Sequence, residues 1–275
     1  MDYSQYSLAK TGYLKEDFRL FHINDRTDRE FEWHYHDFHK IIVFVSGKVT
    51  YHIEGKAYQL KPQDILLVSQ GAIHKPEIDP SIPYERYIFW IRDDLSSPEL
   101  NTCFQKANDR SFNLIRLDSV LQEKLKDLLP EIEHSLRDTQ FGDSILSKAL
   151  FAQFMVYINR IFLKSSTAPD QKSYSSDSQV EQLLKYINRN LSENLSIDHL
   201  AERFFFSKYH MMRKFKKETG YTIHHYIISK RLLHARFLIA QGTPVMKAAM
   251  QSGFQDYTAF VRAYKKQFGT VPTQR

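Results

Sequence analysis

Three histidines in the first third of the chain could supply nitrogen ligands to a metal ion. His34 and His36 are two residues apart, so on an extended strand their side chains share one face. His74 follows the turn sequence SQGAI and could complete a three-nitrogen site. Lys40, four residues after His36, would place a repelling positive charge beside any bound ion. We therefore predict no metal and no cofactor for this chain.

A basic and aromatic sequence occurs twice in the last third of the chain. Ser207–Gly220 reads SKYHMMRKFKKETG and Asp256–Gly269 reads DYTAFVRAYKKQFG, with an arginine, an aromatic residue, two lysines and a glycine at matching places. Each copy follows a short apolar segment at helical spacing, as in a helix-turn-helix unit. A single copy could be an ordinary helix with solvated lysines, but two copies with the same polar face favour DNA binding.

In a helix-turn-helix unit, side chains near the start of the second helix contact base edges, and basic side chains further along contact phosphates. Arginine can donate two hydrogen bonds to guanine, whereas threonine, valine and tyrosine can touch thymine methyl groups or the backbone. The predicted DNA-binding side chains are those that face away from the helical core: Lys208, Tyr209, Met212, Arg213, Lys216, Lys217, Tyr257, Thr258, Val261, Arg262, Lys265 and Lys266.

Charge is distributed unevenly along the 275 residues. Residues 179–275 hold 16 Lys and Arg against 6 Asp and Glu, whereas the preceding 178 residues hold 22 against 26. Clustered basic residues suit a polyanionic partner such as DNA. The charge balance therefore assigns DNA to the C-terminal part and some other task to the N-terminal part.

Cysteine content and apolar runs exclude several protein classes. One cysteine, Cys103, cannot form an internal disulfide, a cysteine-rich zinc module or the reactive cluster of a DNA-repair protein with similar helices. No run approaches the roughly 20 apolar residues of a membrane span, and the N-terminus lacks the pattern of a signal peptide. We expect a cytoplasmic protein without a membrane partner.

The order of strand-like and helix-like patterns predicts an α+β protein of two domains. Short β-branched and aromatic runs alternate with turns from about Phe18 to Ile91, which indicates a small barrel. Leucines at helical spacing follow, and the segment KSSTAPDQKSYSSDS then has the composition of a linker. The predicted divisions are 1–116 for the barrel, 117–164 for a helical pair that mediates dimerisation, 165–178 for the linker and 179–275 for the DNA-binding domain.

Capping residues and glycines divide the last domain into helices. We expect N-caps at Ser196, Ser207, Thr222, Thr243 and Asp256. The segment 222–240 would form a rod of about 28 Å. It could hold two recognition helices about 34 Å apart, one turn of DNA. The predicted helices are 179–191, 197–204, 208–218, 222–240, 245–251 and 256–267.

Nearly all of residues 179–275 resembles the AraC/XylS family of bacterial transcription regulators. Departures from the family pattern are mild, such as Ala248 in place of a larger aliphatic residue and Tyr264 in place of phenylalanine. The resemblance implies two helix-turn-helix units that are joined by a helix and bind adjacent major grooves. It rests on Leu200-Ala201, Ser207, Arg213-x-Phe215-Lys216, Gly220, Arg231-Leu232, Ala235, Gly253-Phe254, Phe260-x-Arg262, Lys265, Gly269 and Pro272.

The same resemblance implies a barrel that binds a small effector, often a sugar or another metabolite. Residues 34–47 also resemble the cupin motif, although Lys40 replaces its glutamate. For each candidate lining residue, ordinary core packing is the alternative to ligand contact. Lys40 and Arg86 would favour an acidic effector. The predicted effector-binding residues are Trp33, His34, His36, Lys40, Tyr51, His74, Tyr84, Arg86 and Trp90.

Together these patterns predict a sequence-specific transcription regulator controlled by a small molecule. Its expected partners are double-stranded DNA, the effector, a second copy of the chain and RNA polymerase. The alternative is a metal-dependent cupin enzyme with a basic accessory domain. The sequence leaves open the effector, the DNA target and whether transcription rises or falls.

Overall fold

The apolar run Ile41 to Phe44 is buried on both faces of its strand, because the strand lies in a sheet that is covered on both sides. Ile41 and Val43 belong to the buried cluster shared with the helices α2 (Ser119–Ser135) and α3 (Asp143–Lys164), whereas Ile42 and Phe44 face the second sheet. In this computed structural model the first sheet has the order β1 (Phe18–Asp25), β7 (Tyr84–Ile91), β2 (His39–Ser46), β5 (Ile65–Val68) and β8 (Leu114–Ile115).

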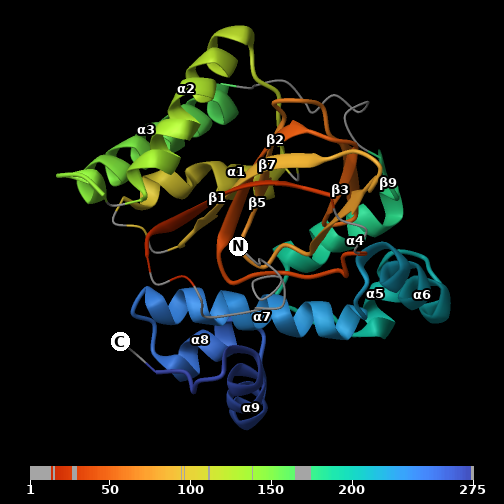
Figure 1. Cartoon of the computed structure of the whole chain (residues 1–275). Helices are drawn as coiled ribbons and strands as arrows, with labels where there is room; N and C mark the ends of the chain where they lie inside the picture. Colours follow the sequence, from red (N-terminus) through yellow and green to blue (C-terminus); the bar gives the residue numbers. More distant parts are fainter. Residues whose placement is uncertain are drawn as a thin grey trace.

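The second sheet closes the other side of the barrel (Figure 1). It is antiparallel throughout, and a two-residue turn joins β3 to β4. Its order is β6 (His74–Ile78), β3 (Val49–Ile53), β4 (Lys56–Gln59) and β9 (Ser175–Ser176). The structure describes residues 14, 16–26, 30–93, 95, 97–110, 112–137, 139–164 and 175–273.

Helices cover the outer face of the first sheet. Phe154 stacks on Phe89 of β7 with ring centroids 4.4 Å apart, and Phe151 stacks on Phe18 of β1 at 3.9 Å. The helices are the 3₁₀ turn η2 (Pro98–Asn101), α1 (Thr102–Arg110), α2 (Ser119–Ser135) and α3 (Asp143–Lys164). By length and apolar composition α3 could also cross a membrane, contrary to the sequence-based expectation, but its Phe154, Met155 and Ile158 are fully buried against the sheet.

The last part of the described chain is helical, and each predicted helix is confirmed within two residues at both ends. Side chains of Ser196, Ser207, Thr222 and Asp256 accept the expected N-cap hydrogen bonds. Thr243 was the wrong choice, because Pro244 is the N-cap residue of α8 and makes no such bond. The helices are α4 (Ser178–Arg189), α5 (Ile197–Arg203), α6 (Lys208–Thr219), α7 (Ile223–Ala240), α8 (Val245–Gln251) and α9 (Tyr257–Phe268).

The end of the predicted linker belongs to regular structure. Ser175 and Ser176 form β9, which pairs with Ala57 and Lys56 at the free edge of the second sheet. Asp177 then caps α4 by accepting hydrogen bonds from the backbone N–H groups of the first turn. Residues 165–174 of the predicted linker lie outside the described residues.

The DNA-binding domain packs directly on the barrel, with α7 running beneath it in Figure 1. Tyr35 and Ile73 of the barrel belong to the buried cluster that α4 to α7 form around Leu184, Tyr226 and Ile227. This contact gives the two domains a shared apolar core.

Two equivalent glycines test this packing. Gly220 and Gly269 end α6 and α9 with φ of 75° and 74°. A Cβ on Gly269 would meet nothing within 4 Å, but on Gly220 it would come within 2.2 Å of the Trp33 ring. Gly269→Ala should lower the free energy of unfolding by about 1 kcal/mol, from backbone strain alone. Gly220→Ala should lower the free energy of unfolding clearly more than Gly269→Ala does, as measured by urea denaturation of the full chain. Equal losses for the two variants would contradict the packing of Trp33 against α6.

Candidate effector pocket and DNA-binding surface

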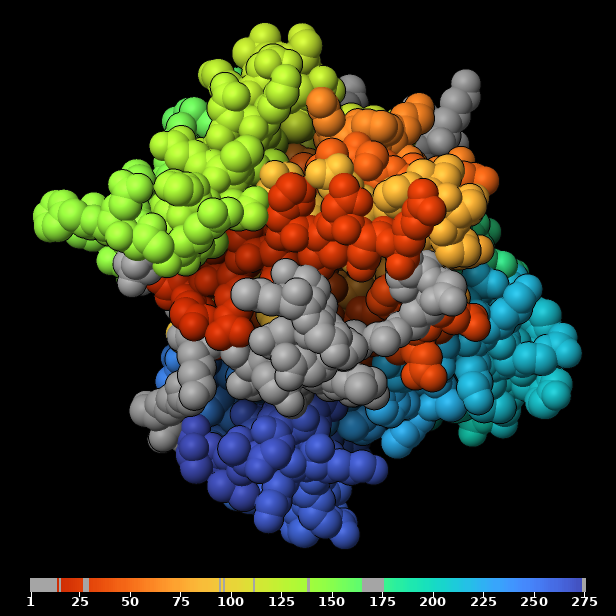
Figure 2. Space-filling view, viewed as in Figure 1, coloured from red at the N-terminus to blue at the C-terminus, as the bar shows by residue number. Residues whose placement is uncertain are grey.

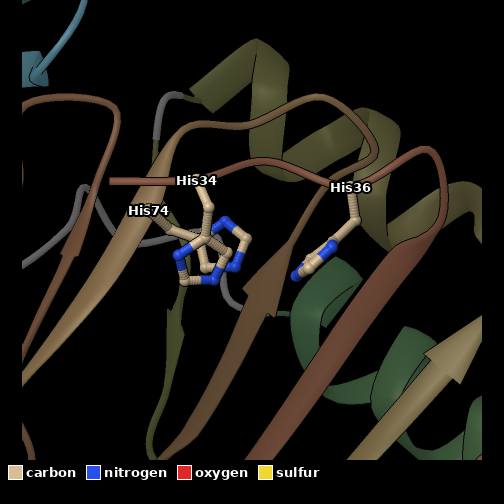
Figure 3. Close-up of side chains that lie close together, drawn as sticks. All are labelled: His34, His36 and His74. Atoms are coloured by element: carbon tan, nitrogen blue, oxygen red, sulfur yellow. The ribbon is translucent and has the colours of Figure 1, made fainter. Parts of the chain in front are cut away.

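The side chains of His34, His36 and His74 lie close together inside the barrel (Figure 3), and the amine of Lys40 lies beside two of them. His34 and His74 pair through backbone hydrogen bonds of 3.1 and 2.9 Å, which sets their rings 4.3 Å apart. Lys40 Nζ lies 3.3 Å from His36 Nε2 and 3.2 Å from His74 Nε2. We call His34, His36, Lys40 and His74 the barrel cluster.

Lys40 occupies the position in which the imidazoles would hold an ion. The candidate ligand atoms of His34, His36 and His74 lie within 4.8 Å of one another. The His74 Nδ1 is 2.8 Å from the carbonyl oxygen of Ala72, so its proton sits there and Nε2 points its lone pair toward the lysine. A metal ion would have to displace this amine, so the cluster as it stands suits an acidic or hydrogen-bonding group better than a cation.

Burial changes the ionisation of the cluster. Loss of solvent, together with the nearby Arg86 charge, lowers the pKa of Lys40 to about 7. Burial, and then the charges of His34, Lys40 and His36, lower the pKa of His74 well below its usual range. With a pKa of about 7, Lys40 is about half protonated at neutral pH, whereas His74 is neutral.

The remaining predicted effector residues surround the cluster, except one. Tyr51 stacks parallel to His74 with centroids 6.0 Å apart, and Trp90 pairs with Lys40 across β7 and β2. Arg86 lies 4.1 Å over the Tyr84 ring and forms an ion pair with Asp25. Trp33 instead points at the DNA-binding domain, since its ring packs beside Gly220 and the edge of His52.

Side chains of the segment 33–37 alternate between the barrel cluster and the DNA-binding domain. His34 and His36 belong to the cluster. Tyr35 Oη is 3.3 Å from Ser229 Oγ of α7, and Asp37 accepts a 2.8 Å ion pair from Arg236 of the same helix. This short segment therefore contacts the barrel cluster with one side and α7 with the other.

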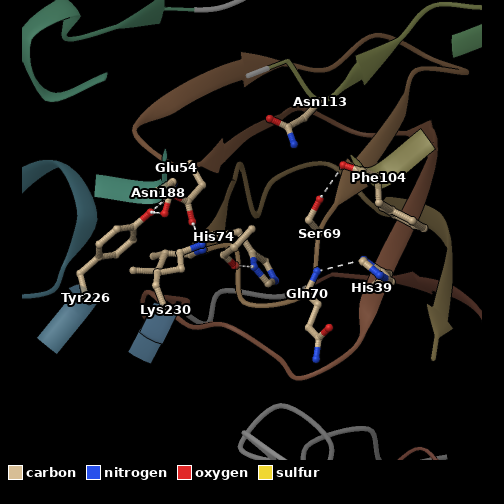
Figure 4. A network of polar contacts seen from close by, with 12 residues as sticks. His39, Glu54, Ser69, Gln70, His74, Phe104, Asn113, Asn188, Tyr226 and Lys230 are labelled. Atoms are coloured by element: carbon tan, nitrogen blue, oxygen red, sulfur yellow. Dashed lines mark hydrogen bonds and ion pairs between the residues drawn. The ribbon is translucent and has the colours of Figure 1, made fainter. Parts of the chain in front are cut away.

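A second contact between the domains centres on Glu54, which sequence reasoning missed. Its Oε1 accepts hydrogen bonds of 2.9 Å from both Lys230 Nζ and the Ile73 N–H, and its Oε2 accepts from the Tyr226 hydroxyl (Figure 4). Burial and the adjacent Glu54 carboxylate raise the pKa of Tyr226 well above its usual range, which keeps the hydroxyl as a donor. Glu54 has φ of 47° in the turn Glu54-Gly55, where asparagine or glycine is preferred. That mismatch was the sequence signal for a special role.

The predicted DNA-binding side chains lie on α6 and α9, and all but Val261, which is partly buried, are exposed. Met211 and Phe215 of α6, and Phe260 and Tyr264 of α9, hold the opposite faces in the core. The first helix packs with the N-terminal half of α7 and the second with its C-terminal half, because their buried residues belong to separate apolar clusters. Lys208 forms an ion pair with Asp198 of α5, so a DNA contact by this lysine would replace an existing one.

Comparisons with known proteins agree with this arrangement. Residues 19–155 match the model of an AraC-like ligand-binding domain, and residues 200–275 match a helix-turn-helix domain. The chain belongs to the AraC/XylS family of transcription regulators. It is a DNA-binding regulator with a ligand-binding domain and not an enzyme, which removes the metal-dependent cupin alternative.

Three relatives cover most of the chain. The HTH-type transcriptional activator RhaR of Mannheimia succiniciproducens is 23% identical over 89% of this chain and 86% of its own length. RhaS of Yersinia pestis, also named a transcriptional activator, is 24% identical over 88% of each chain. The uncharacterized HTH-type regulator YbfI of Bacillus subtilis is 25% identical over 83% of this chain and 80% of its own.

The lowered pKa of Lys40 makes the stability of the protein depend on pH. From pH 7 to about 10 the unfolded chain keeps the lysine proton that the folded chain has lost, so this group makes the free energy of unfolding rise with pH. The slope is at most about 1.4 kcal/mol per pH unit. Lys40→Met removes this contribution while His36, His74 and Arg86 remain. In urea denaturation the free energy of unfolding of the variant should exceed that of the native protein most at pH 7. The difference between the two should shrink toward pH 9. A margin independent of pH would contradict the burial of this ammonium.

Proposed function

We propose that α6 and α9 enter adjacent major grooves of one DNA duplex. The N-terminal half of each helix would read bases through Tyr209, Met212, Arg213, Thr258, Val261 and Arg262. The observation that carries this proposal is that two capped helices, packed on the two halves of α7, carry exposed and matching polar faces. Lys208, Lys216, Lys217, Tyr257, Lys265 and Lys266 would contact the phosphate backbone.

The two helices would prefer different bases. Both copies keep the arginine and the lysine pair, but Tyr209 and Met212 of the first copy correspond to Thr258 and Val261 of the second. Differences at base-contacting positions change the preferred sequence, whereas shared cations add affinity without preference. We therefore propose an asymmetric half-site.

Alanine variants separate base reading from phosphate binding. Arg213→Ala and Arg262→Ala should each weaken binding to the preferred DNA by about 1–3 kcal/mol and relax discrimination at one position. Lys265→Ala should weaken binding to all DNA sequences equally and reduce the salt dependence of the affinity. Lys247→Ala, which removes an exposed charge on α8, is the control. Selection of bound sequences from a random pool, followed by titration of the preferred duplex at several salt concentrations, would measure both effects. Equal losses on all sequences for the arginine variants would make them phosphate contacts.

We further propose that the effector carries an acidic group and binds against the barrel cluster. Lys40 would supply the positive charge, with Arg86 nearby in its ion pair with Asp25, and Tyr51, Tyr84 and Trp90 would supply apolar surface for the rest of the molecule. An anion beside Lys40 would favour its protonated form and disturb its contacts with His36 and His74. The segment 33–37 links those histidines to α7, which offers a direct route from effector to DNA-binding helices.

The helical pair α2 and α3 is proposed as the dimer contact. It projects from the body of the molecule, away from the C-terminal helices (Figure 2). Its outer tip carries exposed apolar side chains that the chain itself leaves uncovered, namely Leu136, Phe141 and Ile145 at 38%, 107% and 74% exposure. RNA polymerase is proposed as a further partner because the relatives are named transcriptional activators, and the cytoplasm as the site of action because the DNA is there.

Charged substitutions at the tip of the helical pair test whether this surface forms the dimer contact. The native chain should sediment as a dimer at micromolar concentration. Phe141→Asp combined with Ile145→Asp should shift it to monomer, because two carboxylates would be buried in the contact. Lys126→Asp, an exposed charge change on α2, should leave the dimer intact. A monomeric native chain, or a dimeric double variant, would place the contact elsewhere.

A further inference from the structure

We propose that a cavity between the barrel and the DNA-binding domain is a second ligand site, suited to a neutral polyhydroxylated molecule of about monosaccharide size. The cavity has a volume of about 410 Å³. Small-molecule sites in proteins range from roughly 300 to 1,000 Å³. Both domains line it, through α1 and the 69–72 turn on one side and α4 and α7 on the other. Among the described residues that line it, none belongs to the barrel cluster, so this site is separate from the proposed acidic effector site.

The walls are rich in side-chain amides. Each amide offers a donor and an acceptor, which is the pairing that sugar hydroxyl groups require. Apolar side chains of Ala72, Ala107 and Leu233 provide surface between them. The amides come from η2, from α1, from loops of the barrel and from α4: Gln70, Asn101, Gln105, Asn108, Asn113 and Asn188.

One of these amides has an oxygen atom that could still accept a hydrogen bond. Asn101 is 4% exposed, and its Nδ2 donates to the carbonyl oxygens of Arg92 at 3.2 Å and Asp93 at 3.0 Å. Its buried Oδ1 accepts no hydrogen bond from the described residues. A buried acceptor without a donor is destabilising, and native proteins rarely keep one without a reason. A ligand hydroxyl would supply the missing donor.

Most of the charges around the cavity are already paired, which argues for a neutral ligand. Glu54 is bound to Lys230 and Asp93 to His39, each at 2.9 Å. Glu181 lies 2.9 Å from Lys56 and 2.8 Å from Lys185. Burial alone would raise the pKa of Glu181, but hydrogen bonds from Lys185, Ser176 and Lys56 lower it to about 2. These ion pairs leave hydrogen bonding, rather than net charge, to select the ligand.

A ligand in this position would hold the two domains together. Glu54 and Lys230 form an ion pair between the domains and also line the cavity, together with Asn188. Figure 4 shows these three side chains close to one another. A molecule that contacts both walls binds only the docked arrangement, so it stabilises that arrangement by its full binding free energy. DNA binding that requires the domains to separate would be weakened by the same factor.

Thermal denaturation of the full chain with named compounds tests this site. The neutral probes are D-glucose, D-galactose, D-xylose and D-mannitol, and the acidic probes are D-gluconate and D-glucuronate. At least one neutral probe at millimolar concentration should raise Tm by about 3 °C or more. Gln105→Trp, which fills the cavity from its exposed rim, should remove that shift. Lys106→Trp, exposed on the next position of α1 and outside the cavity, should keep it. Lys40→Met should also keep it, while losing any shift caused by an acidic probe.

Two results would overturn the proposal. The first is the absence of a Tm shift with every neutral probe. The second is a neutral shift that survives Gln105→Trp and disappears in Lys40→Met, because the ligand would then occupy the barrel. An acidic probe that acts through Lys40 while all neutral probes fail would leave the proposed effector site standing and remove only the interdomain one.

Discussion

The rest of the structure depends on α7, which packs against both helix-turn-helix units and against the barrel. Ile223, Tyr226 and Ile227 complete the core of the first helix-turn-helix unit, and Leu232, Ala235 and Ile239 complete that of the second. The remaining side of the helix faces the barrel through Ser229, Lys230 and Arg236. One helix thus sets the spacing of α6 and α9 and joins both of them to the barrel. Any displacement of α7 would move both reading helices together.

Polar contacts give this interface its selectivity. The apolar part, around Tyr35 and Ile73, would tolerate small shifts, but a carboxylate that accepts three hydrogen bonds fits one arrangement only. Buried ion pairs contribute little net stability because each charge loses its solvent. These polar contacts therefore make the docked arrangement specific without adding much net stability.

Local signals made much of the DNA-binding domain predictable. Caps at Ser207 and Asp256, the glycine ends and the repeated Arg-x-aromatic-Lys pattern each act within one helix, and the family resemblance supplied their order. Thr243 shows the limit of such signals, because Pro244 supplies the extended backbone of the cap without a side-chain bond. Similarly, β9 has the polar composition of a linker and owes its strand conformation to the edge of β4.

The candidate sites also differ in how far they could be predicted from the sequence. The barrel cluster was predictable because His34, His36 and Lys40 lie close in sequence and strand alternation orients them. Glu54 and Lys230 were not, since 176 positions separate them and neither belongs to a motif. Alternation also explains the one misplaced residue of the effector set, because Trp33 precedes His34 and must point to the opposite side.

The pairing of β9 with β4 has a kinetic consequence. It ties the first helix of the DNA-binding domain to the barrel edge, only a few residues from the Glu54 turn. If α7 leaves the barrel while this strand pair holds, the domain stays within reach of its docking surface, and return is a first-order process at high effective concentration. Release and return of α6 and α9 would then proceed at rates that do not depend on the concentration of the regulator in the cell. The rate at which two chains form a dimer would depend on that concentration.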